Sequence, residues 1–153
     1  MKVILPGSYD PVTLGHLEII KRAKELYGEV YAVVFNNPEK SYTFSPEERV
    51  NMLRLATENV GVFVDYSDGL VIDYMKENGI EKIVKGYRNE KDLEYEREMA
   101  EWNKVNGGFE TVLLESSEAF SGISSTLARE RIKSGGELSG ILPEKVIGFL
   151  GNS

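Results

Sequence analysis

The only histidine of the chain, His16, lies in a segment whose glycines would let a ligand approach the backbone closely. Residues 6–16 read Pro-Gly-Ser-Tyr-Asp-Pro-Val-Thr-Leu-Gly-His and lead from an expected strand into an expected helix. Free backbone N–H groups and the helix dipole favour an anion at such a helix start. On residue types alone, the segment could equally be a tight loop that leaves His16 as a partly buried helix residue.

A second segment, residues 120–126, offers several hydroxyl groups ahead of another expected helix. Its hydroxyls and the free amides of the helix start could together hold the oxygens of a polyphosphate. Taken alone, the same segment also fits simple N-capping of the helix by Ser121 or Ser124. It comprises Phe120, Ser121, Gly122, Ile123, Ser124, Ser125 and Thr126.

Three cations are expected at the same edge of the fold, in a chain that is acidic overall. The 153 residues carry 18 Lys and Arg against 25 Asp and Glu, a net charge of −7. Lys-Gly-Tyr-Arg at residues 85–88 follows an apolar strand and Lys40 lies in a loop, whereas Arg49 and Arg129 are expected on helix faces. A single surface cation is usually only solvated, but three at one edge predict a site for anionic ligands.

Composition excludes several kinds of chemistry. The absence of Cys excludes disulfides, thiolate zinc sites and cysteine nucleophiles, and a single His excludes a multi-histidine metal site. The net negative charge argues against non-specific binding to nucleic acid or to an anionic membrane. No apolar run approaches a secretory signal or the roughly 20 residues needed to span a bilayer, so a cytoplasmic protein is expected.

Short β-branched runs alternate with amphipathic stretches, and this predicts an α/β fold in a single domain over residues 1–153. Five strands separated by helices imply right-handed crossovers and a parallel sheet with helices on both faces. Ser-Pro-Glu-Glu at residues 45–48 is a strong helix start signal. Strands are expected at residues 2–5, 30–35, 60–64, 80–84 and 110–114, and helices at 14–26, 46–59, 70–77, 91–105, 124–134 and 143–150.

The predicted sheet would bring the chemically distinctive segments together. In open parallel sheets, ligands bind beyond the carboxyl ends of the strands. Residues 6–16, 36–44, 85–88 and 115–126 follow the first, second, fourth and fifth expected strands. We therefore expect these four segments to meet at one edge.

Nearly the whole chain resembles the phosphopantetheine adenylyltransferases of bacterial coenzyme A synthesis, within the nucleotidylyltransferase superfamily. The Thr-x-Gly-His spacing at residues 13–16 matches the superfamily signature. The order and spacing of six motifs carry the resemblance: Pro-Gly-Ser-Tyr-Asp-Pro-x-Thr-x-Gly-His (6–16), Asn-Pro-x-Lys (37–40), Phe-Ser-x-Glu-Glu-Arg (44–49), Lys-Gly-Tyr-Arg (85–88), Leu-Glu-Tyr-Glu (93–96) and Ile-Ser-Ser-Thr (123–126).

The resemblance implies a Rossmann-like fold of the nucleotidylyltransferase and adenine nucleotide alpha hydrolase-like kind, assembled as a homohexamer. It implies transfer of AMP from ATP to 4′-phosphopantetheine, giving dephospho-coenzyme A and pyrophosphate, with Mg²⁺ held chiefly by the ATP phosphates. His16 and Lys40 would stabilise the transition state, and Arg88 would bind the triphosphate. Phosphopantetheine would contact Ser8, Lys40, Val71 and Lys85. ATP would contact Ser8, Tyr9, His16, Gly86, Tyr87, Arg88, Glu96 and the seven residues from Phe120 to Thr126.

Three positions depart from the common pattern of this family. Many members have Phe in place of Tyr9, Arg in place of Lys85 and an aromatic residue in place of Gly122. Lys85 keeps the charge of an arginine but lacks its bidentate fork, so its grip on a phosphate would differ. Gly122 removes a side chain from the expected ATP loop.

Three other functions remain open on the sequence. The same chemistry could use another acceptor, such as nicotinamide mononucleotide or, with CTP, glycerol 3-phosphate. The chain could be a nucleotide sensor that binds ATP without turnover. A flavodoxin-like binding domain is the third alternative, and it would leave the Ile-Ser-Ser-Thr motif unexplained.

Overall fold

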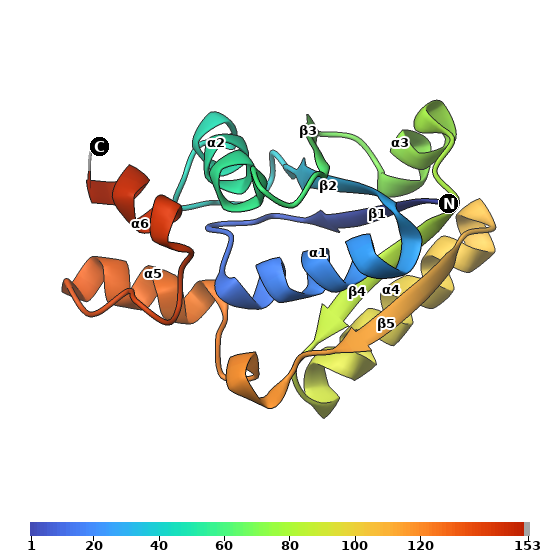
Figure 1. Cartoon of the computed structure of the whole chain (residues 1–153). Coiled ribbons are helices and arrows are strands. Elements are labelled where there is room, and N and C mark those ends of the chain that lie inside the picture. The colour runs from blue at the N-terminus through green and yellow to red at the C-terminus, as the bar shows by residue number, and fades with distance from the viewer. Residues whose placement is uncertain (152–153) are drawn as a thin grey trace.

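The computed structural model describes residues 1–151, which form a five-stranded sheet with helices on both faces (Figure 1). No helix in this part of the chain is long and apolar enough to cross a membrane. The strands are β1 (Lys2–Gly7), β2 (Glu29–Phe35), β3 (Phe63–Ser67), β4 (Lys82–Tyr87) and β5 (Glu110–Glu115). The helices are α1 (Leu14–Tyr27), α2 (Pro46–Thr57), α3 (Val71–Asn78), α4 (Glu90–Gly107), η1 (Glu118–Phe120, a 3₁₀ turn), α5 (Ser125–Ser134) and α6 (Glu144–Gly151).

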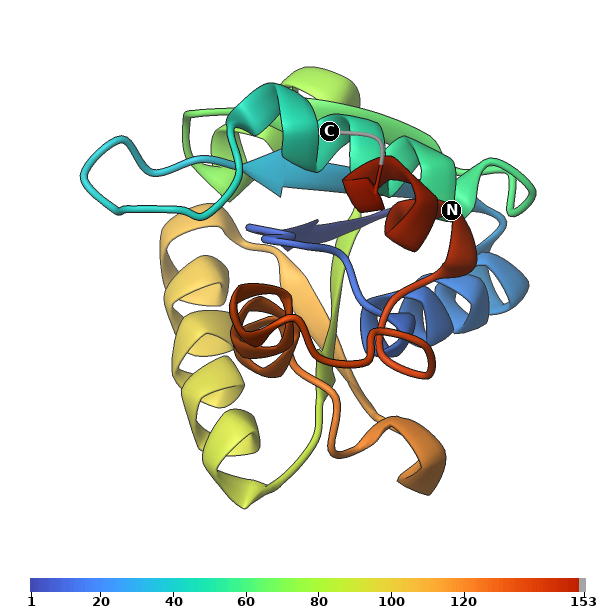
Figure 2. The same ribbon diagram turned by 90° about the vertical axis from the view of Figure 1, so that its left-hand side faces the viewer.

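The sheet is parallel and its strand order is β3-β2-β1-β4-β5, which confirms the predicted Rossmann-like α/β class. The chain proceeds outward from β1 to β3 and then returns to the other side of β1 with β4. The strand order therefore reverses between β1 and β4, and such a reversal is where open α/β sheets bind ligands. The carboxyl ends of the strands point to the left in Figure 1, the side that faces the viewer in Figure 2.

The two central strands part before they reach this edge. β1 pairs with β2 along its whole length. Within residues 1–151, only two residue pairs are aligned between β1 and β4: Val3 with Lys82 and Ile4 with Ile83. The gap between their carboxyl ends lies at the reversal of strand order.

Alternate residues of β1 enter two separate cores, as the period of a strand requires. Val3 and Leu5 pack in the larger core with residues of α1, α2, α5 and α6. Ile4 packs on the opposite face with Met75 of α3. The end of α4 lies beside α3 on this second face, because a Cβ at Gly107 would come within 2.7 Å of an Ile72 side-chain atom.

The third strand lies at residues 63–67 rather than 60–64 as predicted. The N–H of Val60 donates to the carbonyl of Thr57 in the turn that ends α2, and Gly61 has a φ of +80°. A left-handed residue interrupts extended backbone. The apolar run is therefore divided between a turn that packs on the core and the start of the edge strand.

The fourth strand lies at residues 82–87 rather than 80–84. The N–H of Ile80 donates to the carbonyl of Met75 in the C-terminal cap of α3, so it is unavailable to the sheet. At its other end β4 continues to Tyr87. Lys85 and Gly86 are consequently part of the strand, whereas the sequence pattern placed them beyond it.

Candidate active site

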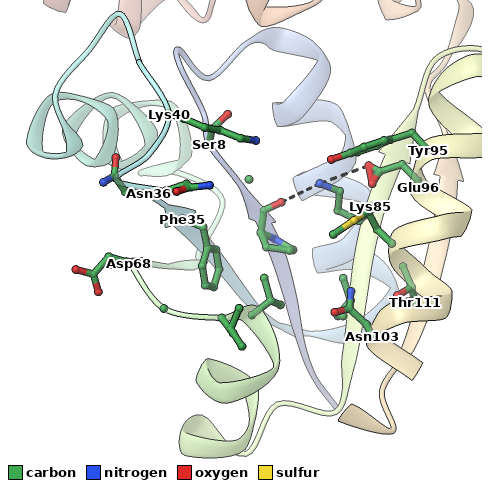
Figure 3. Close-up of a pocket in the computed structure, with 18 of the residues that line it drawn as sticks. Ser8, Phe35, Asn36, Lys40, Asp68, Lys85, Tyr95, Glu96, Asn103 and Thr111 are labelled. Atoms are coloured by element: carbon green, nitrogen blue, oxygen red, sulfur yellow. Dashed lines mark hydrogen bonds and ion pairs between the residues drawn. The ribbon is translucent and has the colours of Figure 1, made fainter. Parts of the chain in front are cut away.

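A pocket of about 620 Å³ opens at the carboxyl edge of the sheet (Figure 3). The ends of β1 and β2 and the loop between β3 and α3 form one side, and β4, β5 and α4 form the other. Its volume lies within the roughly 300–1,000 Å³ of small-molecule and cofactor sites. The pocket is therefore large enough for a substrate.

All four residues predicted to contact phosphopantetheine line this pocket: Ser8, Lys40, Val71 and Lys85. In Figure 3, Ser8 and Lys40 lie on one side of the pocket and Lys85 lies across from them on β4. The Lys85 ammonium donates to the Pro6 carbonyl at 3.2 Å and pairs with Glu96 at 3.4 Å. Lys85 thus bridges β4 and β1 where these strands separate.

Asn103 and Thr111 were missed by sequence reasoning, yet both line the same pocket. Figure 3 draws both in the pocket, Asn103 on α4 and Thr111 on β5. The Thr111 hydroxyl oxygen is buried and has no hydrogen-bond partner in the described chain. Buried polar groups are normally paired, so this oxygen is available to a polar group of a ligand. Neither residue belongs to a motif whose spacing would reveal it.

His16 lies in the first turn of α1 and closes a reciprocal cap with Thr13. The Thr13 backbone N–H donates to His16 Nδ1 at 3.0 Å, and the His16 backbone N–H donates to the Thr13 hydroxyl at 3.3 Å. Because Nδ1 accepts a hydrogen bond from the Thr13 backbone N–H, the neutral ring carries its proton on Nε2. His16 therefore offers an N–H donor to a ligand.

The ring of His16 is kept neutral by its surroundings. Burial lowers the pKa of the imidazole from 6.5 to about 4, and the positive charges of Lys85 and Arg88 lower it in the same direction. The ring also meets the ring of Tyr9 edge-on, with centroids 5.0 Å apart. Tyr9 is itself buried, adopts a φ of +48° and donates its hydroxyl to the Leu5 carbonyl.

This lowered pKa predicts a pH-dependent contribution of His16 to stability. Between about pH 6.5 and pH 4 the unfolded chain binds a proton at His16 that the folded chain does not, so the free energy of unfolding falls as the pH is lowered. We expect the melting temperature to fall more steeply for the wild type than for His16→Gln from about pH 7 to about pH 4.5. Parallel curves from thermal unfolding would contradict the assignment.

Arg88 is held at the start of α4 by Asp92. The Arg88 guanidinium donates to both carboxylate oxygens of Asp92, at 2.9 and 3.3 Å, and the Arg88 backbone N–H donates to the same carboxylate. The preceding Tyr87 carbonyl accepts from the Ser116 N–H. Gly86 packs against α1, because a Cβ there would lie 2.7 Å from Ile19 Cγ1.

The segment from Phe120 to Thr126 lies beside the turn that carries His16. A Cβ on Gly15 would lie 3.8 Å from the Ile123 carbonyl oxygen and 3.9 Å from that of Phe120. Ser124 caps α5 by accepting from the Leu127 N–H, and the Ser125 hydroxyl donates to the Pro11 carbonyl. Capping by Ser124 is thus present, and the Ser125 hydroxyl links this helix start to the segment that precedes α1.

Two arginines have a different environment from the helix faces that the sequence pattern predicted. Arg49 is fully buried and donates to backbone or side-chain oxygens of three residues, Ser8, Asn36 and Phe44. Arg129 donates to the Asp10 carbonyl at 2.8 Å and to the Thr126 hydroxyl at 3.1 Å. The pattern could not show this, because Ser8, Asn36 and Asp10 lie in loops outside the helices that carry the two arginines.

Comparison with known proteins identifies the family. Residues 4–131 match the family model described as cytidylyltransferase-like. A phosphopantetheine adenylyltransferase of Corynebacterium efficiens is 44% identical over 149 residues, 96% of this chain and 94% of the relative. Those of Corynebacterium diphtheriae and Thermotoga neapolitana are 45% and 44% identical, over 95% and 91% of this chain and 92% and 88% of theirs. The chain belongs to the phosphopantetheine adenylyltransferase family.

Membership of the phosphopantetheine adenylyltransferase family confirms the resemblance carried by the six sequence motifs. It also removes the flavodoxin-like alternative. In this member of the family, two groups of residues flank the gap between β1 and β4. One group lines the pocket, and the other gathers around His16 at the starts of α1 and α5.

Proposed function

We propose that the protein transfers the adenylyl group of ATP to 4′-phosphopantetheine, forming dephospho-coenzyme A and pyrophosphate. The observation that carries the proposal is the arrangement at the gap between β1 and β4. A pocket lined by Lys40 and Lys85 lies on one side of it, and a helix start with a neutral His16 lies on the other. Two ligands bound there would meet between Lys85 and His16.

The pocket is the proposed site of phosphopantetheine. Ser8, Lys40 and Lys85 would bind its phosphate, because they supply a hydroxyl and two ammonium groups on facing walls. Val71 and its apolar neighbours would contact the pantetheine arm. Asn103 and Thr111 supply polar groups farther along the pocket, which suit the amides of that arm.

ATP is proposed to bind around the starts of α1 and α5. Free amides at both helix starts favour its phosphates, together with the Nε2–H of His16 and the guanidinium of Arg88. Tyr9, Gly86, Tyr87, Glu96 and the residues from Phe120 to Thr126 complete the proposed ATP site. Glu96 also lines the pocket through its pair with Lys85, so it lies between the two proposed ligands.

The reaction requires positioning more than acid and base catalysis. An oxygen of the acceptor phosphate, already ionised at neutral pH, bonds to the α-phosphorus of ATP. The bond from that phosphorus to pyrophosphate breaks, and its electron pair leaves with pyrophosphate. His16 and Lys40 would stabilise the charge that gathers on the α-phosphate oxygens, and Arg88 would hold the triphosphate.

The described residues do not fit a metal site built by the protein. Within residues 1–151, no group of three or more His, Asp or Glu side chains lies close enough to hold a metal ion. The nearby carboxylates are already engaged, since Asp10 accepts from two backbone amides, Asp92 holds Arg88 and Glu96 pairs with Lys85. We therefore propose that Mg²⁺ enters as part of the substrate, bound by the phosphates of ATP.

Product formation tests the proposed function directly. The purified protein is mixed with ATP, Mg²⁺ and 4′-phosphopantetheine, pyrophosphate release is followed, and the product is identified by mass. Parallel mixtures contain nicotinamide mononucleotide with ATP, or glycerol 3-phosphate with CTP. Dephospho-coenzyme A in the first mixture alone is expected. Turnover only in a parallel mixture would show that the acceptor is not phosphopantetheine. ATP binding without any turnover would favour a nucleotide sensor.

Asp92 provides a test of the ATP side. Asp92→Asn removes the charge that orients Arg88, so we expect the KM for ATP to rise about fivefold to tenfold, with little change in the KM for phosphopantetheine. Steady-state kinetics measure both constants. Glu98→Gln is the matched control, because Glu98 is exposed on the same helix. Equal KM values for ATP in the two variants would show that Asp92 has no part in ATP binding.

We also propose that the protein is a single domain that assembles as a homohexamer in the cytoplasm. Trp102 and Val105 of α4 are large apolar side chains that are exposed in the single chain and lie outside the pocket lining, and they would suit contacts between subunits. Sedimentation analysis is expected to give a mass about six times that of the 17.2 kDa chain. A monomeric mass would refute the assembly.

A further inference from the structure

Arg49 is a buried cation, and each of its three guanidinium nitrogens donates a hydrogen bond within the protein. It lies in the first half of α2, and none of its surface is exposed. Its Nε donates to the Phe44 carbonyl at 3.1 Å, one terminal nitrogen donates to the Ser8 carbonyl at 3.1 Å, and the other donates to the Asn36 side-chain oxygen. Within residues 1–151, no carboxylate pairs with it, so neutral oxygens compensate the buried charge.

These partners belong to the two segments that form one wall of the pocket. Ser8 follows β1, whereas Asn36 and Phe44 stand at the two ends of the loop that carries Lys40. The loop projects from the body of the molecule between β2 and α2 (Figure 2). One guanidinium therefore joins both ends of a projecting loop to the end of the neighbouring strand.

Contacts within the loop extend this attachment toward Lys40. The Arg49 guanidinium lies 4.0 Å from the centre of the Tyr42 ring, and the Tyr42 hydroxyl accepts from the Asn37 N–H. The Lys40 N–H donates to the Asn37 carbonyl. Lys40 is thus linked to Arg49 through two intervening residues, while its own ammonium is left to face the pocket.

The carboxylate of Asp10 holds the same loop from the other side. Its two oxygens accept from the N–H groups of Thr43 and Phe44, each at 2.9 Å. Asp10 is buried, and its neighbour Tyr9 is the residue with positive φ that turns the chain after Ser8. The turn after β1 and the end of the loop are therefore fastened together by Asp10 and Arg49.

We propose that Arg49 is a positioning residue that holds Ser8 and Lys40 in the geometry needed to bind the acceptor phosphate. The proposal rests on the proposed function, because it assigns the acceptor phosphate to these two residues. Arg49 does not itself line the pocket. Lysine cannot replace it, because an ammonium lacks the planar fork that reaches three separated oxygens and stacks on a ring.

Arg49→Lys tests the proposal, and Arg54→Lys is the matched control because Arg54 is exposed on the same helix. We expect kcat/KM for phosphopantetheine to fall about 10²-fold in Arg49→Lys, with the KM for ATP within about twofold of wild type. Amide hydrogen exchange is followed by mass spectrometry without substrates. It is expected to quicken in residues 36–44, while strands β1, β2 and β4 keep wild-type protection.

Each result decides for or against this role. Loop exchange and kinetics equal to those of Arg54→Lys would overturn it. Faster exchange throughout the sheet, with both KM values changed alike, would mean that Arg49 only stabilises the core, which also overturns it. If Arg49→Lys fails to fold, Asn36→Ala removes one partner without changing the helix, and because Asn36 also lines the pocket, loop exchange is then the deciding measurement. If the wild type makes no dephospho-coenzyme A, the proposed function is wrong. Amide hydrogen exchange in residues 36–44 still shows whether Arg49 holds the loop.

Discussion

Replacing His16 with alanine is expected to lower kcat for adenylyl transfer about 10²- to 10³-fold, the usual effect of losing one donor to a developing oxyanion. The reason lies in the hydrogen bond from the Thr13 N–H to Nδ1, which leaves the proton on Nε2. Because the ring is neutral above a pKa of about 4, it acts at physiological pH as a dipolar donor and not as a cation. Single-turnover kinetics with saturating ATP and phosphopantetheine measure the effect.

The control separates this role from the part that His16 plays in the start of α1. His16→Ala also removes one half of the reciprocal cap, which is expected to lower the free energy of unfolding by about 1 kcal/mol. His16→Gln keeps an acceptor for the Thr13 N–H, so it should retain stability and still lose turnover. If His16→Gln turns over at the wild-type rate, a ring donor is not required.

Gly86→Ala is expected to impair both folding and catalysis. The added methyl group would lie 2.7 Å from Ile19 Cγ1, and Ile19 is buried one turn after His16 on α1. Relief of the overlap must move α1 or force Ile19 from its rotamer, at a cost of about 1–3 kcal/mol. Displacement of His16 by about 1 Å would lower kcat about 10²-fold. Chemical denaturation and steady-state kinetics measure the two effects.

A double variant identifies the overlap as the cause. Ile19→Ala removes the side-chain atoms nearest to the added methyl group, so Gly86→Ala with Ile19→Ala should recover part of the lost kcat. Simple addition of the two single effects would show that Gly86 acts by another route. Gly148→Ala serves as the control, because a Cβ at that glycine meets no atom within 4 Å.

The features that sequence patterns predicted correctly are those determined locally. Ser45, Pro46 and Glu48 specify the start of α2 within one turn of chain, and the structure contains the corresponding capping box. The alternation of strands and helices is likewise local, and the general handedness of crossovers then restricts the sheet topology. The rule that ligand sites lie at carboxyl ends correctly located the pocket residues Ser8, Lys40 and Lys85.

The features that the sequence concealed depend on contacts between distant segments. Arg49 looks like an ordinary helix-face residue until the loop at residues 36–44 folds over it and supplies Phe44 and Asn36 as partners. Thr111 becomes a pocket residue only because β5 pairs with β4 and α4 covers the same face. Periodicity reports which face of an element is buried, but not which loop from elsewhere covers it.

Because β1 and β4 separate early, we expect the middle of this sheet to show the faster amide hydrogen exchange that is usual for edge strands. Inner strands ordinarily retain their amide protons longest, since each is bonded on both sides. Beyond Ile4 and Ile83 this pair has no aligned residues in the described chain, and the Lys85 ammonium on the Pro6 carbonyl spans the opening instead. The last residues of β1 should therefore exchange sooner than the matching stretch of β2, and bound substrates should slow them. The site lies at the centre of the sheet because the described residues of β1 and β4 are not paired there.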